Sequence, residues 1–460
     1  MNIIESEMPS DNESIDGLVE SENENDDLDD LMDNNTQYDT DSDNDCESDR
    51  IHDKNDDGWR RCGMSETNFP FTKISGPNIP HTAKSPLDVF SCLFSMEFVD
   101  LLVDQTNIYI DQQTNPLKRS KRIKPEPVTR KEMLTFLGIN MLMGVKKLPS
   151  YRDYWSLNYQ LRDTYISSAM SVNRFGFLLT HLHLNDSSME PKKGHAEYDK
   201  LYKIRPLVDT LSKTFQECWQ PSENQSIDES MVKFKGRSSM KQYLPNKPIK
   251  RGYKIWVRAD EDGFVCQFQI YTGKEKNSKK EDNLGKRVVI DLTRTLIGNY
   301  YRVYLDNFFT GMELMMSLKK DKILGCGTVR VNRKGLPKDH QPDRKMKRGD
   351  SEFRSCSSGI GWVKWKDNKA VYALSNFHDP SKVSETNRKN KDGSVSVISC
   401  PDIIKDYNQH LGYVDKADML KSLYEIDRKS KKWWHRLFWH LLDVAVTNAF
   451  VIDKKKEFLT

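Results

Sequence analysis

The spacing of hydrophobic residues changes twice along this chain of 460 residues, and that change limits the possible folds more than any other feature. Over the first 220 residues the apolar positions recur at steps of three and four, which is the period of an amphipathic helix. The pattern predicts helices over four stretches: 87–103, 130–147, 172–183 and 201–219. We therefore expect the ordered parts of the first half to be helical.

After residue 225 the apolar residues alternate with polar ones, which is typical of β-strands. Strands are predicted at 226–234, 253–259, 264–271, 301–306, 323–331 and within 363–377. Helices are predicted between and after them, around 287–292, at 311–319 and from 401 to about 456. Strands that alternate with helices in this way indicate an α/β core with a mixed sheet.

Charge is distributed very unevenly along the chain. Residues 1–57 hold 22 acidic residues against Arg50 and Lys54, a net charge of −20, whereas the remainder carries +23. An acidic stretch so poor in apolar residues cannot offset its chain entropy, so we expect a disordered tail. Residues 58–85 contain several prolines and no period, as in a linker. The basic body favours a polyanionic partner, most simply nucleic acid.

Two other classes of protein are disfavoured by the sequence. No apolar run reaches the roughly 18–20 residues of a membrane-spanning helix, so no membrane partner is expected. No two of the eight cysteines have CxxC spacing, so a zinc knuckle is not indicated. Reduced thiols in a cytosolic or nuclear protein are the simplest interpretation.

Four acidic residues occupy positions that can carry chemistry. Asp228 lies in the first predicted strand and Asp306 at the C-terminal end of a later one, where open α/β sheets place their sites. Asp415 and Asp418 share one face of a C-terminal helix. Converging carboxylates without Cys or His suit Mg²⁺, and two such ions can clamp the attacking and leaving oxygens of a phosphodiester. The pattern alone equally allows surface acids or helix caps.

Basic residues gather near the first of these acids. They lie before and within the second predicted strand, interleaved with Tyr243 and Trp256: Lys235, Arg237, Lys247, Lys250, Arg251 and Lys254. A second group follows later, comprising Arg330, Arg333 and Lys334. Both groups suit contact with DNA phosphates, and the first also suits base stacking. A solvated hairpin face is the alternative interpretation of the first group.

Several short motifs occur in a fixed order along the chain. They are Phe136-Leu-Gly-Ile-Asn-Met-Leu-Met-Gly, Tyr151-Arg-Asp-Tyr-Trp, Ser226-Ile-Asp-Glu-Ser-Met, Phe234-Lys-Gly-Arg-Ser-Ser-Met-Lys-Gln-Tyr-Leu-Pro-Asn-Lys-Pro, Leu284-Gly-Lys-Arg-Val-Val, Tyr304-Leu-Asp-Asn-Phe-Phe-Thr, Gly327-Thr-Val-Arg-Val-Asn-Arg and Asp406-Tyr-Asn-Gln-His-Leu-Gly-Tyr-Val-Asp-Lys-Ala-Asp. In this order they resemble the piggyBac transposases and their domesticated derivatives, over about residues 85–455.

The resemblance implies an α/β fold with a ribonuclease H-like catalytic core and an inserted mainly-β domain, flanked by an all-α dimerisation and DNA-binding domain. It implies a catalytic triad of Asp228, Asp306 and Asp415, with Asp418 as a further metal ligand, and two Mg²⁺ ions that Mn²⁺ can replace. The family cuts and rejoins DNA at TTAA sites. The implied partners are therefore transposon ends, TTAA targets and a second copy of the chain, and the implied location is the nucleus.

The same resemblance divides the chain into seven segments. In order they are the acidic tail (1–57), the linker (58–85), the first part of the helical domain (86–222), the first part of the core (223–320), the insertion (321–400), the last part of the core (401–422) and the last part of the helical domain (423–460).

One departure from the family leaves two functions open. Members of the family continue into a Cys- and His-rich zinc domain, which this sequence lacks where it ends at Thr460. The expected function is a piggyBac-type DNA transposase or a derivative of one. The alternative is a domesticated DNA-binding protein without transposition activity. A fragment of an ordinary transposase would carry the same sequence.

Overall fold

The computed structural model describes residues 58–66, 69–113, 126–245, 247–273, 283–390 and 392–457. The tail expected to be disordered, residues 1–57, lies outside the described residues. No described helix combines the length and the apolar character that crossing a bilayer requires.

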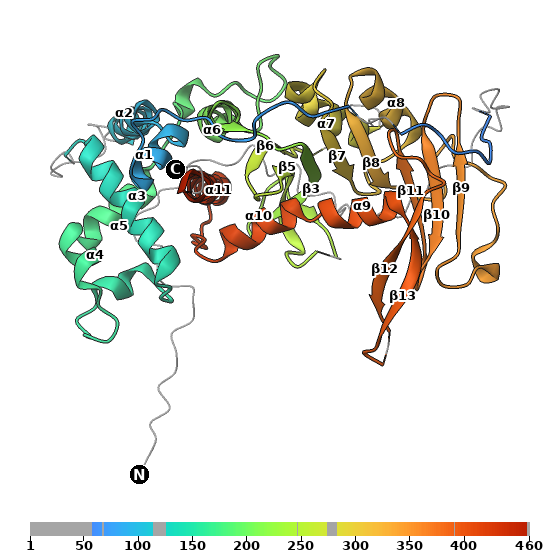
Figure 1. The fold of residues 1–460 in the computed structure, drawn as a ribbon. Coiled ribbons are helices and arrows are strands. Elements are labelled where there is room, and N and C mark those ends of the chain that lie inside the picture. The colour runs from blue at the N-terminus through green and yellow to red at the C-terminus, as the bar shows by residue number, and fades with distance from the viewer. Residues whose placement is uncertain are drawn as a thin grey trace, which may run out of the picture.

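The N-terminal half is helical, as its apolar period predicts (Figure 1). Helices α1 to α6 span Pro86–Leu93, Met96–Gln113, Arg130–Val145, Thr164–Ala169, Val172–His181 and Arg205–Cys218. The first predicted helix is in fact two, because the chain turns at Phe94. Ser85 and Asp88 form a capping box that begins α1, and the Phe98 amide donates to the Ser95 hydroxyl where α2 begins. Such local caps set helix starts that an apolar period does not reveal.

Within the described residues, nine strands form one mixed sheet. Strands β3 to β11 span Asn224–Lys233, Gln242–Tyr243, Arg251–Asp260, Val265–Ile270, Arg302–Leu305, Leu324–Thr328, Ser351–Ser355, Gly361–Lys366 and Ala370–Ser375. Their order is β4-β5-β3-β7-β8-β11-β10-β9, with β6 paired to β5. Strands β3, β7 and β8 are parallel, and the other pairs are antiparallel. The predicted mixed α/β fold is confirmed.

Helices cover both faces of this sheet. Helices α7 (Leu284–Thr293) and α8 (Met312–Lys320) pack on one face, where Ile227, Val303 and Leu305 belong to their apolar cluster. Helices α9 (Asp402–His410) and α10 (Tyr413–Ser422) run along the other face (Figure 1). Side chains alternate between the faces of a strand, so the residue after Ile227 or Leu305 points toward α9 and α10.

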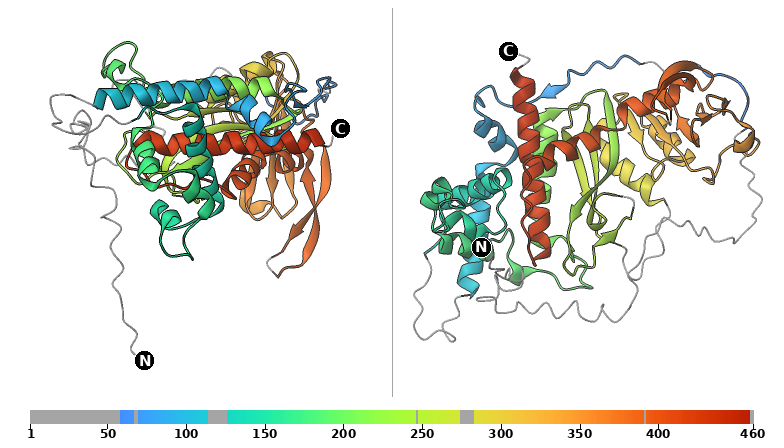
Figure 2. Two further views of the ribbon diagram at one scale, coloured as in Figure 1. Left: turned by 90° about the vertical axis from the view of Figure 1, so that its left-hand side faces the viewer. Right: turned by 90° about the horizontal axis from the view of Figure 1, so that it is seen from below.

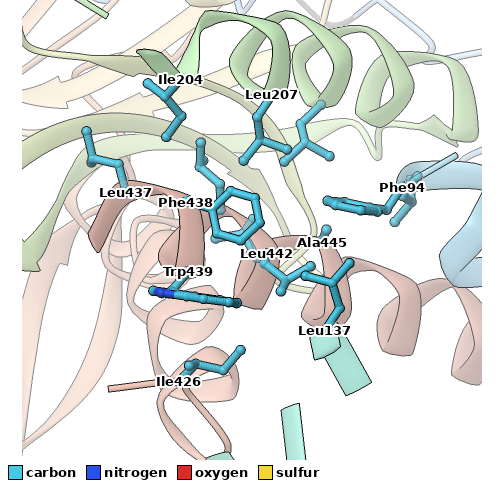
Figure 3. Close-up of a cluster of buried hydrophobic side chains, with 14 of the residues drawn as sticks. Phe94, Leu137, Ile204, Leu207, Ile426, Leu437, Phe438, Trp439, Leu442 and Ala445 are labelled. Carbon is cyan, nitrogen blue, oxygen red and sulfur yellow. The ribbon is translucent and has the colours of Figure 1, made fainter. Parts of the chain in front are cut away.

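Helix α11 (Trp433–Glu457) joins the helical part to the sheet. It runs between the N-terminal helices and the sheet in the view from below (Figure 2). Its residues Phe438, Trp439 and Leu442 pack with Phe94 and Leu137 in a shared apolar core (Figure 3). The first and last helical segments therefore fold together around α11, although they lie far apart in the sequence.

The described residues of the segment predicted as a linker, 58–66 and 69–85, contact the body at several points. The Trp59 indole donates to the carbonyl of Gly335 at 2.8 Å. Strand β1 (Gly76–Pro77) pairs with β2 (Trp219–Gln220). The segment crosses the molecule from the β9 side to α1 (Figures 1 and 2). It lacks a period because most of it pairs through isolated contacts rather than in long regular elements.

The segment predicted as an insertion contributes to the same sheet. Its first strand, β8, continues the parallel strands by pairing with β7. Strands β11, β10 and β9 then extend the sheet, and β12 (Val383–Lys389) pairs with β13 (Val395–Pro401) in a separate ribbon that projects from it (Figure 1). Strand β8 therefore belongs with the parallel strands β3 and β7, and the domain boundary at residue 321 stays a prediction.

Candidate active site

Strand register sets the first two predicted acids side by side. Ile227 of β3 pairs with Leu305 of β7 in parallel register, so Asp228 and Asp306 are the next residues of neighbouring strands. Paired strands lie about 4.8 Å apart. Both carboxylates point to the face that α9 and α10 cover, because Ile227 and Leu305 belong to the opposite apolar cluster. The neighbouring strands β3 and β7 therefore place two acids side by side where β7 ends.

Helix α10 brings the other two predicted acids to this face. The Ser230 hydroxyl of β3 donates to Asp418 Oδ1 at 2.8 Å, which fixes the helix against the strand. Asp415 lies in the first turn of α10 and is exposed. Burial among protein atoms raises the pKa of Asp418, and the charge of Asp415 adds to this, although 39% of the Asp418 side chain is exposed.

A lysine ammonium lies among these carboxylates. Lys247 Nζ is 3.6 Å from Asp228 Oδ2 and 3.4 Å from Glu229 Oε1. Burial and the charge of Glu229 raise the pKa of Asp228 to about 7, and Lys247 opposes that shift. Burial lowers the pKa of Lys247, but the charges of Asp228, Glu229 and Asp415 outweigh it, so its pKa is raised. Lys247 thus occupies the position of a counter-cation.

Asp306 is held by a hydroxyl pair that the sequence did not indicate. The Thr328 hydroxyl donates to Asp306 Oδ1 at 3.3 Å and lies 3.3 Å from the hydroxyl of Tyr407. Burial raises the pKa of Tyr407, and the charges of Asp306 and Asp228 raise it further. Tyr407 therefore lies near both strand carboxylates. The sequence could have indicated this contact only through position, because Thr328 is the last residue of β8 and Asp306 directly follows the neighbouring strand β7.

The four acids have the type of ligand atom that a hard cation such as Mg²⁺ prefers, but their side chains do not converge on one point. Within the described part of the chain, no three Asp, Glu, His or Cys side chains lie close enough to hold a metal ion. The four predicted acids offer only oxygen atoms, which Mg²⁺ prefers. Lys247 places a positive charge beside Asp228 and balances part of the negative charge of these acids.

Five of the nine predicted DNA-binding residues are exposed, and the other four are partly buried. Two of the four face the acids: Lys247, described above, and Lys254, whose ammonium lies 3.9 Å from Glu229 and 4.5 Å from the Phe308 ring. The exposed ones are Lys235, Arg237, Lys250, Arg251 and Lys334. Glu229, which pairs with both lysines, was missed by the sequence analysis.

The remaining two, Arg330 and Arg333, hold the loop that follows Asp306. Arg330 Nε donates to Asn307 Oδ1 at 3.2 Å, and Arg333 Nη2 donates to the Phe308 carbonyl at 2.7 Å. These contacts fix the backbone directly after a catalytic candidate. DNA contact by either guanidinium stays a prediction.

A buried network beneath α9 fixes this helix to the sheet. The Tyr304 hydroxyl donates to Asp406 Oδ2 at 2.7 Å. His378 Nε2 lies 3.1 Å from Asp406 Oδ2, and His410 Nδ1 lies 3.2 Å from Asp406 Oδ1. Burial raises the pKa of Asp406, but hydrogen bonds from both histidines outweigh it and hold its pKa well below the usual range. Burial lowers the pKa of His410, but Asp406 outweighs it, so the pKa is raised.

This network predicts a pH-dependent contribution to stability. A raised His410 pKa stabilises the fold fully below about pH 6.5, the usual histidine pKa, and this gain is lost as pH rises through the folded value. The depressed Asp406 pKa contributes above about pH 4 and is lost at lower pH. Asp406→Asn should therefore destabilise most between these limits. Thermal unfolding from pH 5 to 9 measures this, and a difference from wild type that stays constant with pH would contradict it.

A family model described as Transposase IS4 matches residues 85–450. This range includes the sheet, the helices on both its faces and all four predicted acids. The chain therefore belongs to this transposase family.

Similar proteins narrow the family to its piggyBac type. Human PiggyBac transposable element-derived protein 3 is 30% identical over 412 residues, which cover 86% of this chain and 66% of that protein. Human PiggyBac transposable element-derived protein 2 is 26% identical over 378 residues, covering 80% and 62%. The chain thus spans slightly less than two thirds of the length of these relatives.

A solved structure agrees with the sequence matches. The cryo-EM structure of a piggyBac transposase synaptic complex with hairpin DNA superposes with a TM-score of 0.71 at 27% identity. The match covers 83% of this chain and 78% of that one. The resemblance inferred from the motifs is confirmed for the fold and the family.

Proposed function

We propose that this chain is a piggyBac-type DNA transposase, or a derivative that retains its cleavage site, and that it acts on TTAA sites in the nucleus as a homodimer. The observation that carries the proposal is the parallel register that sets Asp228 beside Asp306. Helix α10 adds Asp415 and Asp418 from the face toward which both acids point. Acids from β3, from the end of β7 and from α10 that lie on the same side of the sheet support a ribonuclease H-like core.

Asp228, Asp306, Asp415 and Asp418 would hold two Mg²⁺ ions, or Mn²⁺ in their place. When bound, such ions activate a water or a DNA 3′-hydroxyl and stabilise the leaving oxygen. Thr328 holds one oxygen of Asp306 and leaves the other available, and Ser230 does the same for Asp418. Lys247 opposes the rise in the Asp228 pKa and so favours the ionised carboxylate that a metal ligand requires.

The exposed basic residues supply the charge for DNA binding. Lys235, Arg237, Lys250 and Arg251 lie around the β4–β5 hairpin, next to the strand that carries Asp228. Lysine and arginine near phosphates release counterions from DNA, so binding through them weakens as salt rises. The superposed piggyBac transposase was solved as a synaptic complex with hairpin DNA, which supports the same partner.

Nicking of a labelled duplex that contains TTAA tests this function directly. We expect cleavage by the purified chain with Mg²⁺ or Mn²⁺ and none after chelation, because the acids alone supply no nucleophile. Cleavage that persists in a chelator would overturn the metal-dependent mechanism. A duplex in which TTAA is scrambled is the matched control for site preference.

A derivative that binds DNA without cutting it is the second candidate. It is favoured by the finding that, among the described residues, no three acidic side chains lie close enough to hold a metal ion. Tight duplex binding without nicking in either metal would select this candidate. Failure to excise a reporter that is flanked by TTAA and by the terminal repeats of the transposon that encodes this chain would agree with this candidate.

A further inference from the structure

The Lys247 side chain crosses the edge of strand β3 at the point where β7 ends. The parallel pairing of β3 with β7 stops at Ile227, so Asp228 and Glu229 lie just beyond it. Consecutive residues of a strand point to opposite faces, yet Lys247 Nζ lies 3.6 Å from Asp228 Oδ2 and 3.4 Å from Glu229 Oε1. The ammonium therefore lies across the strand edge and contacts a carboxylate from each face.

The backbone around Lys247 forms a closed turn before β5. The Leu244 amide donates to the Lys250 carbonyl at 2.9 Å, and the Lys247 amide donates to the Leu244 carbonyl at 3.3 Å. Only 30% of the Lys247 side chain is exposed, and the exposed fractions of Asp228 and Glu229 are 15% and 13%. Charges that are shielded from water in this way interact more strongly than charges on an open surface. The turn thus holds one cation against two carboxylates.

The two carboxylates differ in the number of cations beside them. Glu229 contacts a second lysine, because Lys254 Nζ lies 3.9 Å from its Oε2 and only 12% of the Lys254 side chain is exposed. Among the described residues, Lys247 is the only cation within ion-pair distance of Asp228. The neighbouring Asp306 is held instead by the neutral hydroxyl of Thr328. Of the two strand acids, Asp228 is thus the one whose charge a lysine balances.

A divalent ion and the Lys247 ammonium would compete for Asp228. Both need its carboxylate oxygens, and like charges a few ångströms apart repel each other. Glu229 lies 3.4 Å from the same ammonium and is not among the predicted metal ligands. Lys247 can therefore leave Asp228 and still keep a carboxylate partner, which avoids the high cost of an unpaired, shielded charge.

We propose that Lys247 is a place-holding cation at the predicted metal site: its ammonium balances Asp228 before a divalent ion binds and transfers to Glu229 when the ion arrives. The proposal deepens the proposed function and rests on it, because it takes Asp228 to be a metal ligand. Lys247 is then a positioning residue, which keeps a shielded carboxylate charged and in place without contacting the reacting atoms. Glu229, which has no part in the proposed cleavage, receives the ammonium.

Binding of Mn²⁺ alone, measured without DNA, tests the proposal. Titrations that follow free Mn²⁺ by its electron paramagnetic resonance signal would compare wild type with Lys247→Met, which removes the charge and keeps a long side chain. They would be made at pH 8, because burial raises the pKa of Asp228 to about 7. We expect the dissociation constant to fall about tenfold in the variant, since no ammonium competes for Asp228.

Thermal unfolding provides a second readout of the same competition. In a chelator, Lys247→Met should unfold at a lower temperature than wild type, because Asp228 and Glu229 lose a shared counter-charge. Added Mn²⁺ should stabilise the variant more than wild type, since stabilisation by a ligand grows with its affinity. The two unfolding temperatures should therefore converge as Mn²⁺ is added, and a constant difference between them would contradict the proposal.

Two matched variants separate the charge of Lys247 from its structural role. Lys247→Arg keeps the positive charge, so its Mn²⁺ affinity should stay close to that of wild type. Lys213→Met makes the same change at an exposed lysine of α6 that pairs with Glu217 at 3.8 Å, and it should leave Mn²⁺ binding unchanged. Equal or weaker Mn²⁺ binding by Lys247→Met would overturn the proposal, because a lysine that only supports the fold yields no gain when it is removed. If the methionine variant does not fold, the neutral Lys247→Gln replaces it under the same criteria.

The nicking assay separates this proposal from the function on which it rests. Tighter Mn²⁺ binding by Lys247→Met in a chain that nicks no DNA would keep the place-holding cation and remove the enzyme. Nicking by a chain whose Lys247 variants bind Mn²⁺ as wild type does would remove the place-holding cation alone. A chain that neither binds Mn²⁺ nor nicks DNA would remove both.

Discussion

Replacing Asp306 by Asn should reduce metal-dependent nicking on the order of 10³-fold or more, as expected when a residue acts as part of a catalytic unit. The substitution keeps the shape of the side chain and the oxygen that accepts from the Thr328 hydroxyl. It removes the charge that a divalent ion requires. Nicking rates of both proteins at saturating Mg²⁺ measure the effect.

An acid far from the sheet edge provides the control for Asp306→Asn. Asp104 is exposed on α2 and is not among the predicted site residues. Asp104→Asn makes the same chemical change and should nick at the wild-type rate. If Asp306→Asn also nicked at that rate while both variants remained folded, the triad assignment would be wrong. Duplex affinity should be equal in the two variants, because neither changes the basic surface.

The carboxylates could be predicted because they depend on short-range pattern and on register. Asp228 lies within an alternating strand and Asp306 directly follows another, and parallel pairing of those strands makes them neighbours. Asp415 and Asp418 share a helix face through local geometry alone. The motifs that resemble piggyBac transposases then selected these acids from among the 68 in the chain.

Contacts between distant side chains could not be predicted in the same way. Thr328 and Tyr407 lie 79 residues apart, and their hydroxyls meet only after α9 packs on β8. The Trp59 indole bonds to Gly335, 276 residues away, so a segment without a hydrophobic period still has a fixed position on the body. No period encodes pairings of this kind, because each depends on how separate elements dock.

The roles of the basic residues could be predicted only in part, because the sequence does not show where each side chain points. Lys247 was expected to contact DNA, yet its ammonium lies beside Asp228 and Glu229. Arg333 donates to the backbone after Asp306. The sequence reports the charge of a side chain but not its direction, and here that direction decides between contact with phosphate and support of the site.

Replacing Trp439 by Ala should lower the free energy of unfolding by about 3–5 kcal/mol, the usual cost of deleting a buried aromatic side chain. Trp439 is 1% exposed on α11, and its ring lies 4.8 Å from that of Phe438 and 6.1 Å from that of Phe136. The ring packs between α11 and α3, so the cavity would weaken the contact between these two helices (Figure 3). Chemical denaturation of wild type and variant measures the difference.

Two matched variants test whether packing causes the loss in Trp439→Ala. Trp439→Phe keeps most of the ring, and the indole Nε1 that it removes has no hydrogen-bond partner among the described residues. It should therefore cost much less than the Ala variant. Phe450→Ala, on the same helix but 54% exposed, should change stability by less than about 1 kcal/mol. If all three variants lost similar stability, the helix itself rather than the shared core would be the source. A large loss confined to Trp439→Ala would mean that the packing of α11 against the N-terminal helices supplies a large part of the stability of the fold.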